Sequence, residues 1–299
     1  MDSLALLFDA PILALQLLLD GILVGAIFAL AAYGMALVWG VMNVINIAQG
    51  EFVILGGYVG VLLFESGVHP LAGIPVAAGV LFVVGWLLYR VVIFRIVERD
   101  LFVSLLATFG ISIVMQQLMN EFFGADIRNT NPGLGTRFLF DGMVTVAEVK
   151  LVGFAFALAL GVALVFFLKT SRLGQAIRAT AQNARAARLM GIDTDRIYAT
   201  TFALNAAICG AAGTLVAMTW VIHPFMGLIY TIRAFMLVII AGLGNLAGVI
   251  VAGLGLGAAE NFAGFILGAE FQAAFVFSLL VVILVGRSLL LGRQRRYLK

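Results

Sequence analysis

The feature that most constrains this chain is a series of long apolar segments separated by short polar stretches. About 20 apolar residues in a helix cross the roughly 30 Å hydrocarbon core of a bilayer. Hydropathy along the sequence predicts nine such segments, at residues 20–41, 52–65, 71–93, 101–120, 149–168, 198–221, 229–242, 246–266 and 271–286. Hydrophobic residues make up 63% of the 299 residues, whereas soluble domains have about 45–50%. The sequence therefore predicts an integral membrane protein.

Only helices and closed barrels pair every backbone polar group inside hydrocarbon. The segments lack the alternation of apolar and polar residues that is typical of membrane barrels. The sequence thus predicts an all-α, polytopic helical bundle of about 8–10 transmembrane segments, some of them interrupted. We expect residues 1–299 to form a single transmembrane domain.

The cationic residues predict an orientation. Most of the 18 Lys and Arg residues lie in three regions, 90–99, 169–196 and the tail 287–299. Because short loops rich in Lys and Arg stay on the cytoplasmic side, all three regions are predicted to be cytoplasmic. Nine spans then place the N-terminus outside, the C-terminus in the cytoplasm and residues 121–148 in an external loop. The basic tail is expected to contact anionic lipid headgroups.

Two polar breaks interrupt the apolar sequence. The first runs from Asn43 to Glu51 and includes most of the motif INIAQGEF at Ile45–Phe52, and the second covers residues 242–245. An ionisable group at the bilayer centre costs about 2.5–3.5 kcal/mol on insertion scales, so it is rarely placed there without a function. The segments beside the breaks, 52–65 and 229–242, extend only about 21 Å as helices.

Paired short or interrupted segments point to a binding or permeation path, since unwound backbone at membrane depth needs protein or water around it. The alternative is that the glycines only allow close helix packing. We favour a path for the two breaks that contain Asn, and packing for the scattered glycines. The residues predicted to form the path or its gate are Asn43, Asn46, Gln49, Gly50, Glu51, Gly242, Gly244, Asn245 and Glu260.

Three charged residues within the apolar segments have competing interpretations. Glu51 either stabilises the positive end of a helix dipole or lines the path. Glu260 lies too deep in its segment to reach the interface, so a buried hydrogen-bonded role is favoured over substrate contact. Arg233 is expected to extend to the lipid headgroups, in preference to binding a substrate carboxylate.

The sequence does not indicate chemistry on this chain. The single cysteine, Cys209, excludes an internal disulfide, and His69 and His223 do not have the spacing of metal ligands. A P-loop is absent, as is a nucleophile and base at a recognisable spacing. We therefore predict no catalytic residue, no metal site and no bound cofactor. The net charge of +3 is explained by the cytoplasmic loops and does not indicate nucleic acid binding.

Residues 171–196 are predicted to form the one sizeable amphipathic helix that does not span the membrane, ending at Gly191. One side of this helix would carry Ile177, Ala181, Ala184 and Arg188. The residues predicted to contact a partner are Gln175, Arg178, Ala181, Ala184, Arg185, Arg188 and Gly191. Protein docking is favoured over a position on the membrane surface, because the helix lacks the Trp, Phe and Leu face of membrane anchors.

Together these regions resemble the smaller permease subunit of ATP-binding-cassette importers for branched-chain amino acids, over nearly the whole chain. The motifs that carry the resemblance are Gly40-Val41-Met42, INIAQGEF, Gly56-Gly57-Tyr58, RATAQN at 178–183, LMGIDTDR at 189–196, His223-Pro224, Gly227, Arg233-Ala234-Phe235 and AGLGNLAG at 241–248. The set is specific because many separate motifs agree.

The resemblance implies a permease that translocates branched-chain amino acids, or a related small polar solute, by alternating access. The implied partners are a second homologous permease subunit, in a heterodimer in preference to a homodimer, two cytoplasmic ATP-binding subunits and an external substrate-binding protein. ATP and Mg²⁺ would bind those ATPases, not this chain. Residues 171–196 resemble the coupling helix that fits into a cleft of an ATPase subunit.

The chain departs from the family pattern at both breaks. The family usually has Asn-Phe-Ala-His-Gly-Glu where this chain has NIAQGE at 46–51, and Gly-Ser-Ile-Pro-Gly where it has GNLAG at 244–248. Gln49 cannot change charge near neutral pH as a histidine can. Relatives of this architecture also carry urea, short amides or small organic acids, which stay open as alternative substrates. A self-contained channel or secondary carrier is the alternative from another class.

Overall fold

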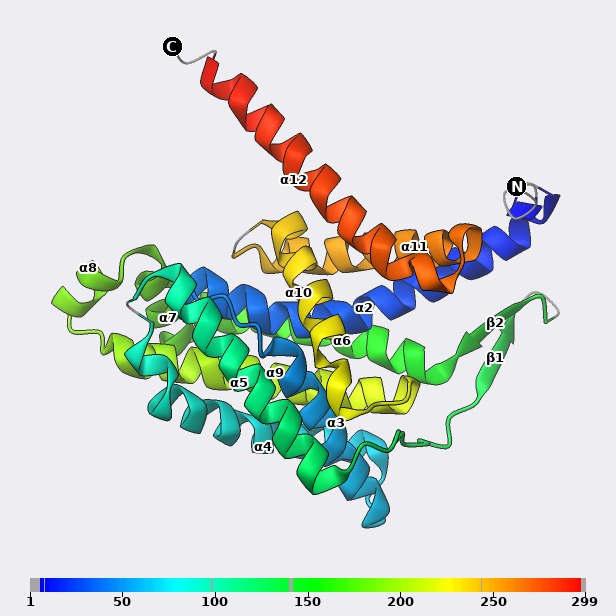
Figure 1. The fold of residues 1–299 in the computed structure, drawn as a ribbon, viewed down its shortest axis with the longest axis horizontal. Coiled ribbons are helices and arrows are strands. Elements are labelled where there is room, and N and C mark those ends of the chain that lie inside the picture. The colour runs from blue at the N-terminus through cyan, green and yellow to red at the C-terminus, as the bar shows by residue number, and fades with distance from the viewer. Residues whose placement is uncertain (1–5, 8, 98, 140–141, 243, 297–299) are drawn as a thin grey trace.

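The computed structural model describes residues 6–7, 9–97, 99–139, 142–242 and 244–296. They form a helical bundle with one short β hairpin (Figure 1). The helices are α2 Pro11–Met42, α3 Gln49–Glu65, α4 Pro70–Val91, α5 Leu101–Phe123, α6 Glu148–Thr170, α7 Arg172–Gln182, α8 Ala184–Leu189, α9 Thr194–Thr219, α10 Gly227–Ala241, α11 Leu246–Leu267 and α12 Gln272–Arg296. The strands are β1 Thr136–Leu139 and β2 Val144–Ala147, and short 3-10 turns lie at Ile93–Arg95, Pro224–Met226 and Ala269–Phe271.

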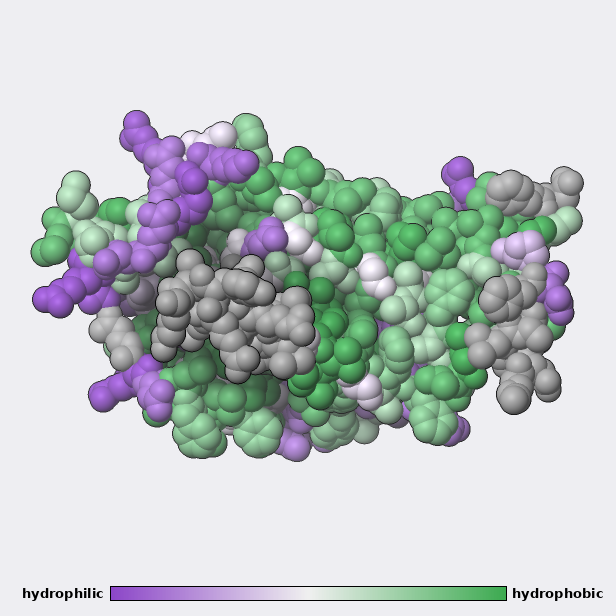
Figure 2. Space-filling model, turned by 90° about the horizontal axis from the view of Figure 1, so that it is seen from above, coloured by the Kyte–Doolittle hydropathy of each residue, from purple (hydrophilic) through white to green (hydrophobic). Residues whose placement is uncertain are grey.

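Among the described residues, 8 helices are long and apolar enough to cross a membrane. They correspond to the predicted apolar segments except 52–65, which forms α3, a helix of only 17 residues. Large apolar side chains face outward, and Figure 2 shows a mostly apolar surface with hydrophilic residues gathered mainly towards its two ends. Soluble monomers rarely expose an apolar surface of this extent. The prediction of an all-α, polytopic membrane bundle is therefore confirmed.

The first span is longer than the apolar segment that predicts it. The predicted start at residue 20 is wrong, because α2 begins at Pro11 and runs for 32 residues. Proline suits the first turn of a helix, where its missing N–H is not needed. Asp20 does not end the helix, since its carboxylate pairs with the ammonium group of Lys150 on α6. A charged residue that has a partner can thus lie inside this span.

The basic tail predicted at 287–299 is not separate from the last span. The backbone of α12 continues from the apolar segment as a helix to Arg296. Leu and Arg are good helix formers, and Gly292 does not end the helix. Residues 297–299, including Lys299, lie outside the described part of the chain.

Helix α9 lies at the centre of the bundle, and nearly all of its side chains are buried. It packs against α2, α3 and α4. Many of the buried residues of α9 are small, among them Ala203, Ala206 and Ala212. Small residues let helices approach closely, and the resulting van der Waals contact drives helix association in a bilayer.

Segment 121–148, predicted as a loop, contains a β hairpin that the sequence analysis did not predict. β1 and β2 are antiparallel, with Thr136 opposite Ala147. Val144 and Val146 of β2 pack against Leu23 of α2 in a small apolar cluster. The strands have four residues each, too few for a clear alternating pattern in the sequence. Residues 140–141 lie outside the described part of the chain.

Candidate functional site

The first polar break is the connection between α2 and α3. Helix α2 ends at Met42, and Asn43 has a left-handed backbone conformation with φ of 52°. Among non-glycine residues, Asn is one of the few that tolerate this conformation readily. The side chain of Asn43 is exposed, so it is separate from the buried polar groups that follow. Its conformation turns the chain away from α2 and towards the start of α3.

Asn46 and Gln49 lie in a fully buried network that joins the break to α2 and α9. Gln49 Nε2 donates to the Ala31 carbonyl oxygen at 2.7 Å and to Asn205 Oδ1 at 2.8 Å. Asn46 Nδ2 donates to Gln49 Oε1 at 3.1 Å. Cys209 Sγ lies 3.0 Å from Gln49 Nε2. Both ends of the Gln49 amide are therefore engaged, and the side chain holds the break against two long helices.

Gly50 brings the first turn of α3 against the first turn of α10. The Gly50 N–H donates to Thr231 Oγ1 at 2.8 Å. Thr231 Oγ1 also donates to the Ile47 carbonyl oxygen at 2.9 Å. A Cβ atom on residue 50 would lie 1.7 Å from the Gly227 carbonyl oxygen, so only glycine permits this approach. The break and the start of α10 are thus one packed unit.

Glu51 connects α3 to α5. It lies in the first turn of α3, but its carboxylate does not bond to the backbone of that turn in the way expected of a helix cap. Glu51 Oε1 instead accepts hydrogen bonds from Ser112 Oγ at 3.0 Å and Gln116 Nε2 at 2.8 Å. Oε2 lies beside Gly227 and has no hydrogen-bond partner among the described residues. The carboxyl group is fully buried.

Sequence analysis did not identify Asn205, Thr231, Ser112 or Gln116, which complete these contacts. Asn205, Thr231 and Ser112 are single polar residues between apolar neighbours, which is the signal that the sequence offers for them, whereas Gln116 is followed by a second glutamine. Their separation from the break in sequence reaches 184 residues, for Thr231 and Ile47. Such partners become visible only once the helices are packed.

The second break has two glycines in conformations that other residues rarely adopt. Gly242 has φ of 87° and Gly244 has φ of 74°. Leu243, the residue between them in the predicted break, lies outside the described residues. The backbone reverses here between α10 and α11, and positive φ values explain why glycine is needed at both positions.

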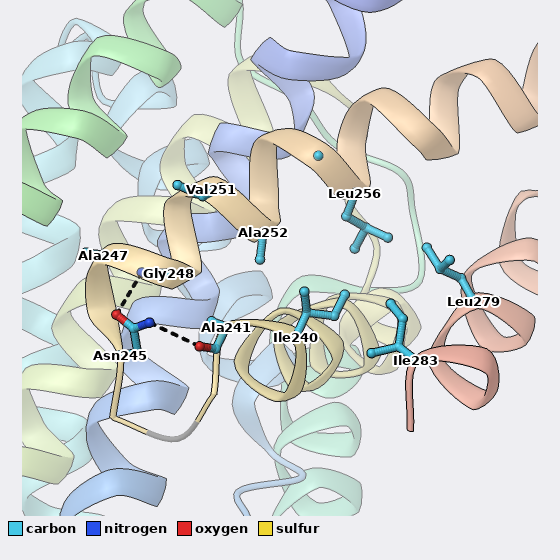
Figure 3. A pocket seen from close by; sticks show the side chains of 11 residues that line it. Ile240, Ala241, Asn245, Ala247, Gly248, Val251, Ala252, Leu256, Leu279 and Ile283 are labelled. Atoms are coloured by element: carbon cyan, nitrogen blue, oxygen red, sulfur yellow. Dashed lines mark hydrogen bonds between the residues drawn. The ribbon is translucent and has the colours of Figure 1, made fainter. Parts of the chain in front are cut away.

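The Asn245 side chain forms hydrogen bonds to both α10 and α11 at this reversal (Figure 3). Asn245 Oδ1 accepts from the Gly248 N–H at 3.0 Å and caps α11, while Nδ2 donates to the Ala241 carbonyl oxygen at 3.1 Å in α10. Asn is among the most favourable N-cap residues. Asn245 also lines an apolar cavity of about 670 Å³ between α10, α11 and α12, which Leu256 and Ile283 face.

The end of α2 brings the two breaks near each other. A Cβ atom on Gly40 would lie 3.3 Å from Gly244 Cα in the second break. Trp39 stacks on Phe235 of α10, with ring centroids 5.2 Å apart. The first break begins at Asn43, in the next turn of the chain. The second break therefore lies beside the end of α2, from which the first break continues.

Glu260 is buried on α11, where it forms an ion pair with Arg233 of α10. Arg233 Nη2 donates to Glu260 Oε1, and Arg233 Nε donates to Oε2 at 3.3 Å. The expectation that Arg233 extends to lipid headgroups is wrong, because its guanidinium is held by this carboxylate and lies over the Phe28 ring, 4.6 Å from the centroid. The buried, hydrogen-bonded role favoured for Glu260 is confirmed.

Residues 171–196 form two helices, so the prediction of a single helix is wrong. Helix α7 ends at Gln182, and Asn183 is extended, with φ of −159° and ψ of 98°. Asn183 Oδ1 accepts from the Ala186 N–H at 2.9 Å and caps α8. Asn favours this capping position over a helix interior, which explains the interruption. Gly191, with φ of 83°, follows the end of α8 as predicted.

The prediction that Ile177, Ala181, Ala184 and Arg188 share one side of a helix is also wrong. Ile177 is buried together with Gly174 and Thr180, whereas Ala181 is exposed. The break at Asn183 changes the chain direction, so helical spacing cannot be continued across it. The predicted partner-contact residues that are exposed are Gln175, Arg178, Ala181, Arg185, Arg188 and Gly191, and Ala184 is half-buried.

Two large apolar side chains project at the C-terminal end of α8, from its last residue and from the residue that follows. Leu189 is 83% exposed and Met190 is 82% exposed. The sequence analysis used these residues only as part of a motif and did not predict their exposure. Figure 1 shows α7 and α8 at the end of the molecule opposite the β hairpin. We call residues 172–191, with this apolar pair, the coupling segment.

Comparison with known proteins places the chain among transport permeases. It is 30% identical to the high-affinity branched-chain amino acid transport system permease protein LivH of Salmonella typhimurium and of Escherichia coli K12, over 93% of this chain and 96% of theirs. The corresponding protein BraD of Pseudomonas aeruginosa is also 30% identical, with the same coverage. A chain in the structure of PsaBC from Streptococcus pneumoniae in complex with Fab aligns with a TM-score of 0.48 and 12% identity, over 94% of each chain, which is too distant to bear on the assignment.

The family comparison agrees with the individual relatives. The family described as branched-chain amino acid transport system / permease component matches residues 17–285. That match includes both breaks, the Arg233–Glu260 pair and the coupling segment. Among the described residues, no group of three or more His, Cys, Asp or Glu side chains could hold a metal ion. The chain belongs to the family of branched-chain amino acid transport system permease components.

Proposed function

We propose that this chain is the permease subunit of an ATP-binding-cassette importer for branched-chain amino acids or a related small polar solute. Family membership supports a transport role, and the coupling segment provides a surface outside the apolar part of the bundle. The substrate crosses by alternating access. The chain performs no reaction and binds no cofactor, because ATP and Mg²⁺ bind to partner subunits.

The arrangement in the membrane follows from the cationic residues. The Lys and Arg residues concentrated in 90–99, 169–196 and the tail support a cytoplasmic position for the coupling segment and the C-terminus, and the hairpin then lies outside the bacterial inner membrane. Two ATP-binding subunits dock in the cytoplasm and a substrate-binding protein docks outside. A second, homologous permease subunit completes the path, in a heterodimer in preference to a homodimer.

The observation that carries the proposal is the exposed pair Leu189 and Met190 on the coupling segment. Burial of apolar surface contributes about 25 cal/mol per Å², so a partner that covers this pair gains stability. Arg178 and Arg185 are exposed on the same segment. An apolar cleft with an acidic rim would therefore complement the surface in both shape and charge.

Contacts between helices connect this surface to the first break. Helix α7 contacts α2 and α9. Gln49 of the break bonds to the same two helices, through Ala31 and Asn205. Movement of the coupling segment by an ATPase would displace α2 and α9 and with them the buried network. The two breaks, which both adjoin the end of α2, would form part of the gate.

The double substitution Leu189→Asp with Met190→Asp tests the proposal. We expect the ATP-binding subunits to stop co-purifying with the permease and cellular uptake of radiolabelled leucine to be lost, because two charges replace the apolar contact. Ala184 is a poorer choice, since it is half-buried and a larger side chain would disturb the bundle. Leu139→Asp on the hairpin, where the side chain is 45% exposed, is the matched control and should leave association intact.

Two results would overturn the proposal. Normal co-purification in the double variant would mean that the pair does not dock to an ATPase and instead lies on the membrane surface. Unchanged uptake after loss of the ATPases would support a self-contained channel or secondary carrier. Urea, short amides and small organic acids are compared with leucine in the same uptake assay.

A further inference from the structure

A cavity of about 420 Å³ lies between α2, α6, α10 and α11, and its lining residues are not those of either break. Small-molecule sites typically have volumes of about 300–1,000 Å³. Under the proposed orientation the cavity is in the outer half of the bundle, since Asp20 lies in the first part of α2 and Trp220 follows the end of α9. A solute released by an external binding protein would meet this cavity before it reached the breaks.

Four charged side chains line the cavity as two ion pairs. Arg233 pairs with Glu260, and their side chains are only 17% and 7% exposed. Lys150 pairs with Asp20, and their side chains are 19% and 30% exposed. The lining thus carries two positive and two negative groups with no net charge. Ion pairs withdrawn from water often contribute less stability than apolar residues of similar size, so one largely buried pair and one partly buried pair beside one cavity suggest a functional role.

An apolar wall lies beside these charges. The Phe28 ring stacks on Trp220 with centroids 5.9 Å apart and meets Tyr230 edge-on at 6.2 Å. Val24 and Ile229 extend the wall with aliphatic side chains. The cavity therefore combines a compact charged region with an apolar surface, the composition that a small amphipathic solute requires.

We infer that this cavity is a binding site for a zwitterionic α-amino acid with an apolar side chain. The solute's carboxylate would bind the Arg233 guanidinium or the Lys150 ammonium, and its ammonium would bind the Glu260 or Asp20 carboxylate. Its side chain would lie against Phe28 and the neighbouring apolar groups. The inference assigns a binding site to the solute of the transport function proposed above and rests on that proposal.

The need to keep every charge in the cavity paired favours a zwitterionic solute over a singly charged or neutral one. A solute with one positive and one negative group can separate an ion pair and leave every charge with a partner. A carboxylate without an ammonium, or an ammonium without a carboxylate, would leave one protein charge unpaired in a poorly solvated place, which is costly. A neutral solute such as urea would bring no charge to replace the pair it separates. The cavity thus distinguishes the amino acid from the alternative substrates.

Thermal unfolding of the purified permease–ATPase complex in detergent, without the binding protein, tests the site. L-Leucine should raise the unfolding temperature of the permease in a saturable manner. 4-Methylpentanoate and 3-methylbutylamine have the same branched chain but lack the ammonium or the carboxylate, and neither should give this shift. The double variant Arg233→Gln with Glu260→Gln removes both charges together, so no lone buried charge remains, and leucine should bind it at least tenfold more weakly.

The control is Arg137→Gln with Glu148→Gln, which removes an ion pair at the hairpin and should keep the leucine shift. The absence of a shift in the unsubstituted complex, an equal shift with either analogue, or an unchanged shift in the Arg233–Glu260 variant would overturn the inference. These results are independent of the docking test, because ligand binding is measured without transport. Normal co-purification of the ATP-binding subunits with the Leu189→Asp, Met190→Asp variant, together with an intact leucine shift, would contradict the proposed coupling alone.

Discussion

Gln49 is the residue on which the first break depends most. Its amide group accepts from Asn46 and donates to Ala31 and Asn205, so a single side chain satisfies three other buried polar groups. Inside a membrane protein no water is available to replace these bonds at low cost. The family pattern has histidine here, but in this chain the position holds an uncharged structural connector, and its hydrogen bonds do not depend on pH near neutrality.

Gln49→Leu should destabilise the bundle strongly. Each buried polar group left without a partner costs about 1–3 kcal/mol, and the substitution affects three of them. The expected result is a clearly lower thermal unfolding temperature in detergent. Gln117→Leu makes the same change on an exposed face of α5 and is the matched control. Equal unfolding temperatures for the two variants would contradict the role assigned to the Gln49 network.

At this scale the sequence predicted which residues matter better than it predicted their partners. Glu260 was recognisable as buried because it lies deep in an apolar segment. Its partner Arg233, 27 residues away, was not, because the pairing depends on how α10 and α11 pack. The same reason explains why Asn205 was missed as the partner of Gln49.

Among the elements, the coupling segment shows most clearly how one residue shapes a local structure. Asn183 ends α7 and caps α8, which lets the chain change direction before Leu189 and Met190. A continuous helix would place the apolar pair elsewhere. The break is therefore a structural requirement for the proposed docking surface.

Asn183→Ala should weaken ATPase association while leaving the membrane bundle intact. Loss of the cap costs about 1 kcal/mol and removes the signal that separates α7 from α8. Co-purification with the ATP-binding subunits measures the effect. Asn183→Asp keeps a capping oxygen and should retain association. Equal co-purification of the ATP-binding subunits with the Asn183→Ala and Asn183→Asp variants would show that the cap does not position the docking surface.

Helices and strands could be predicted where one strong signal in the sequence determined them. The long spans follow from hydropathy alone, since no other structure buries such segments. The β hairpin was missed because its strands are short and its stability depends on Leu23 of α2. The two-helix form of residues 171–196 was missed because good helix formers on both sides of Asn183 concealed a capping residue.

Across the whole molecule, the arrangement of the helices could not be predicted from the sequence. α3 is too short to be counted as a span, and α10 runs across α2 instead of alongside it (Figure 1). Both short helices begin at the same place, where Gly50 meets Gly227. The second break lies at the opposite end of α10, beside Gly40 of α2, so α2 and α10 connect the two breaks.

ATP dependence of leucine transport is the most direct test of this account. The complete complex, with its second permease subunit, ATP-binding subunits and binding protein, is reconstituted in proteoliposomes, and radiolabelled leucine transport is measured with ATP on the side of the coupling segment. The account predicts transport against a concentration gradient that requires ATP and disappears in the Leu189→Asp, Met190→Asp variant. Leucine flux of equal rate without ATP, or through this chain alone, would contradict it.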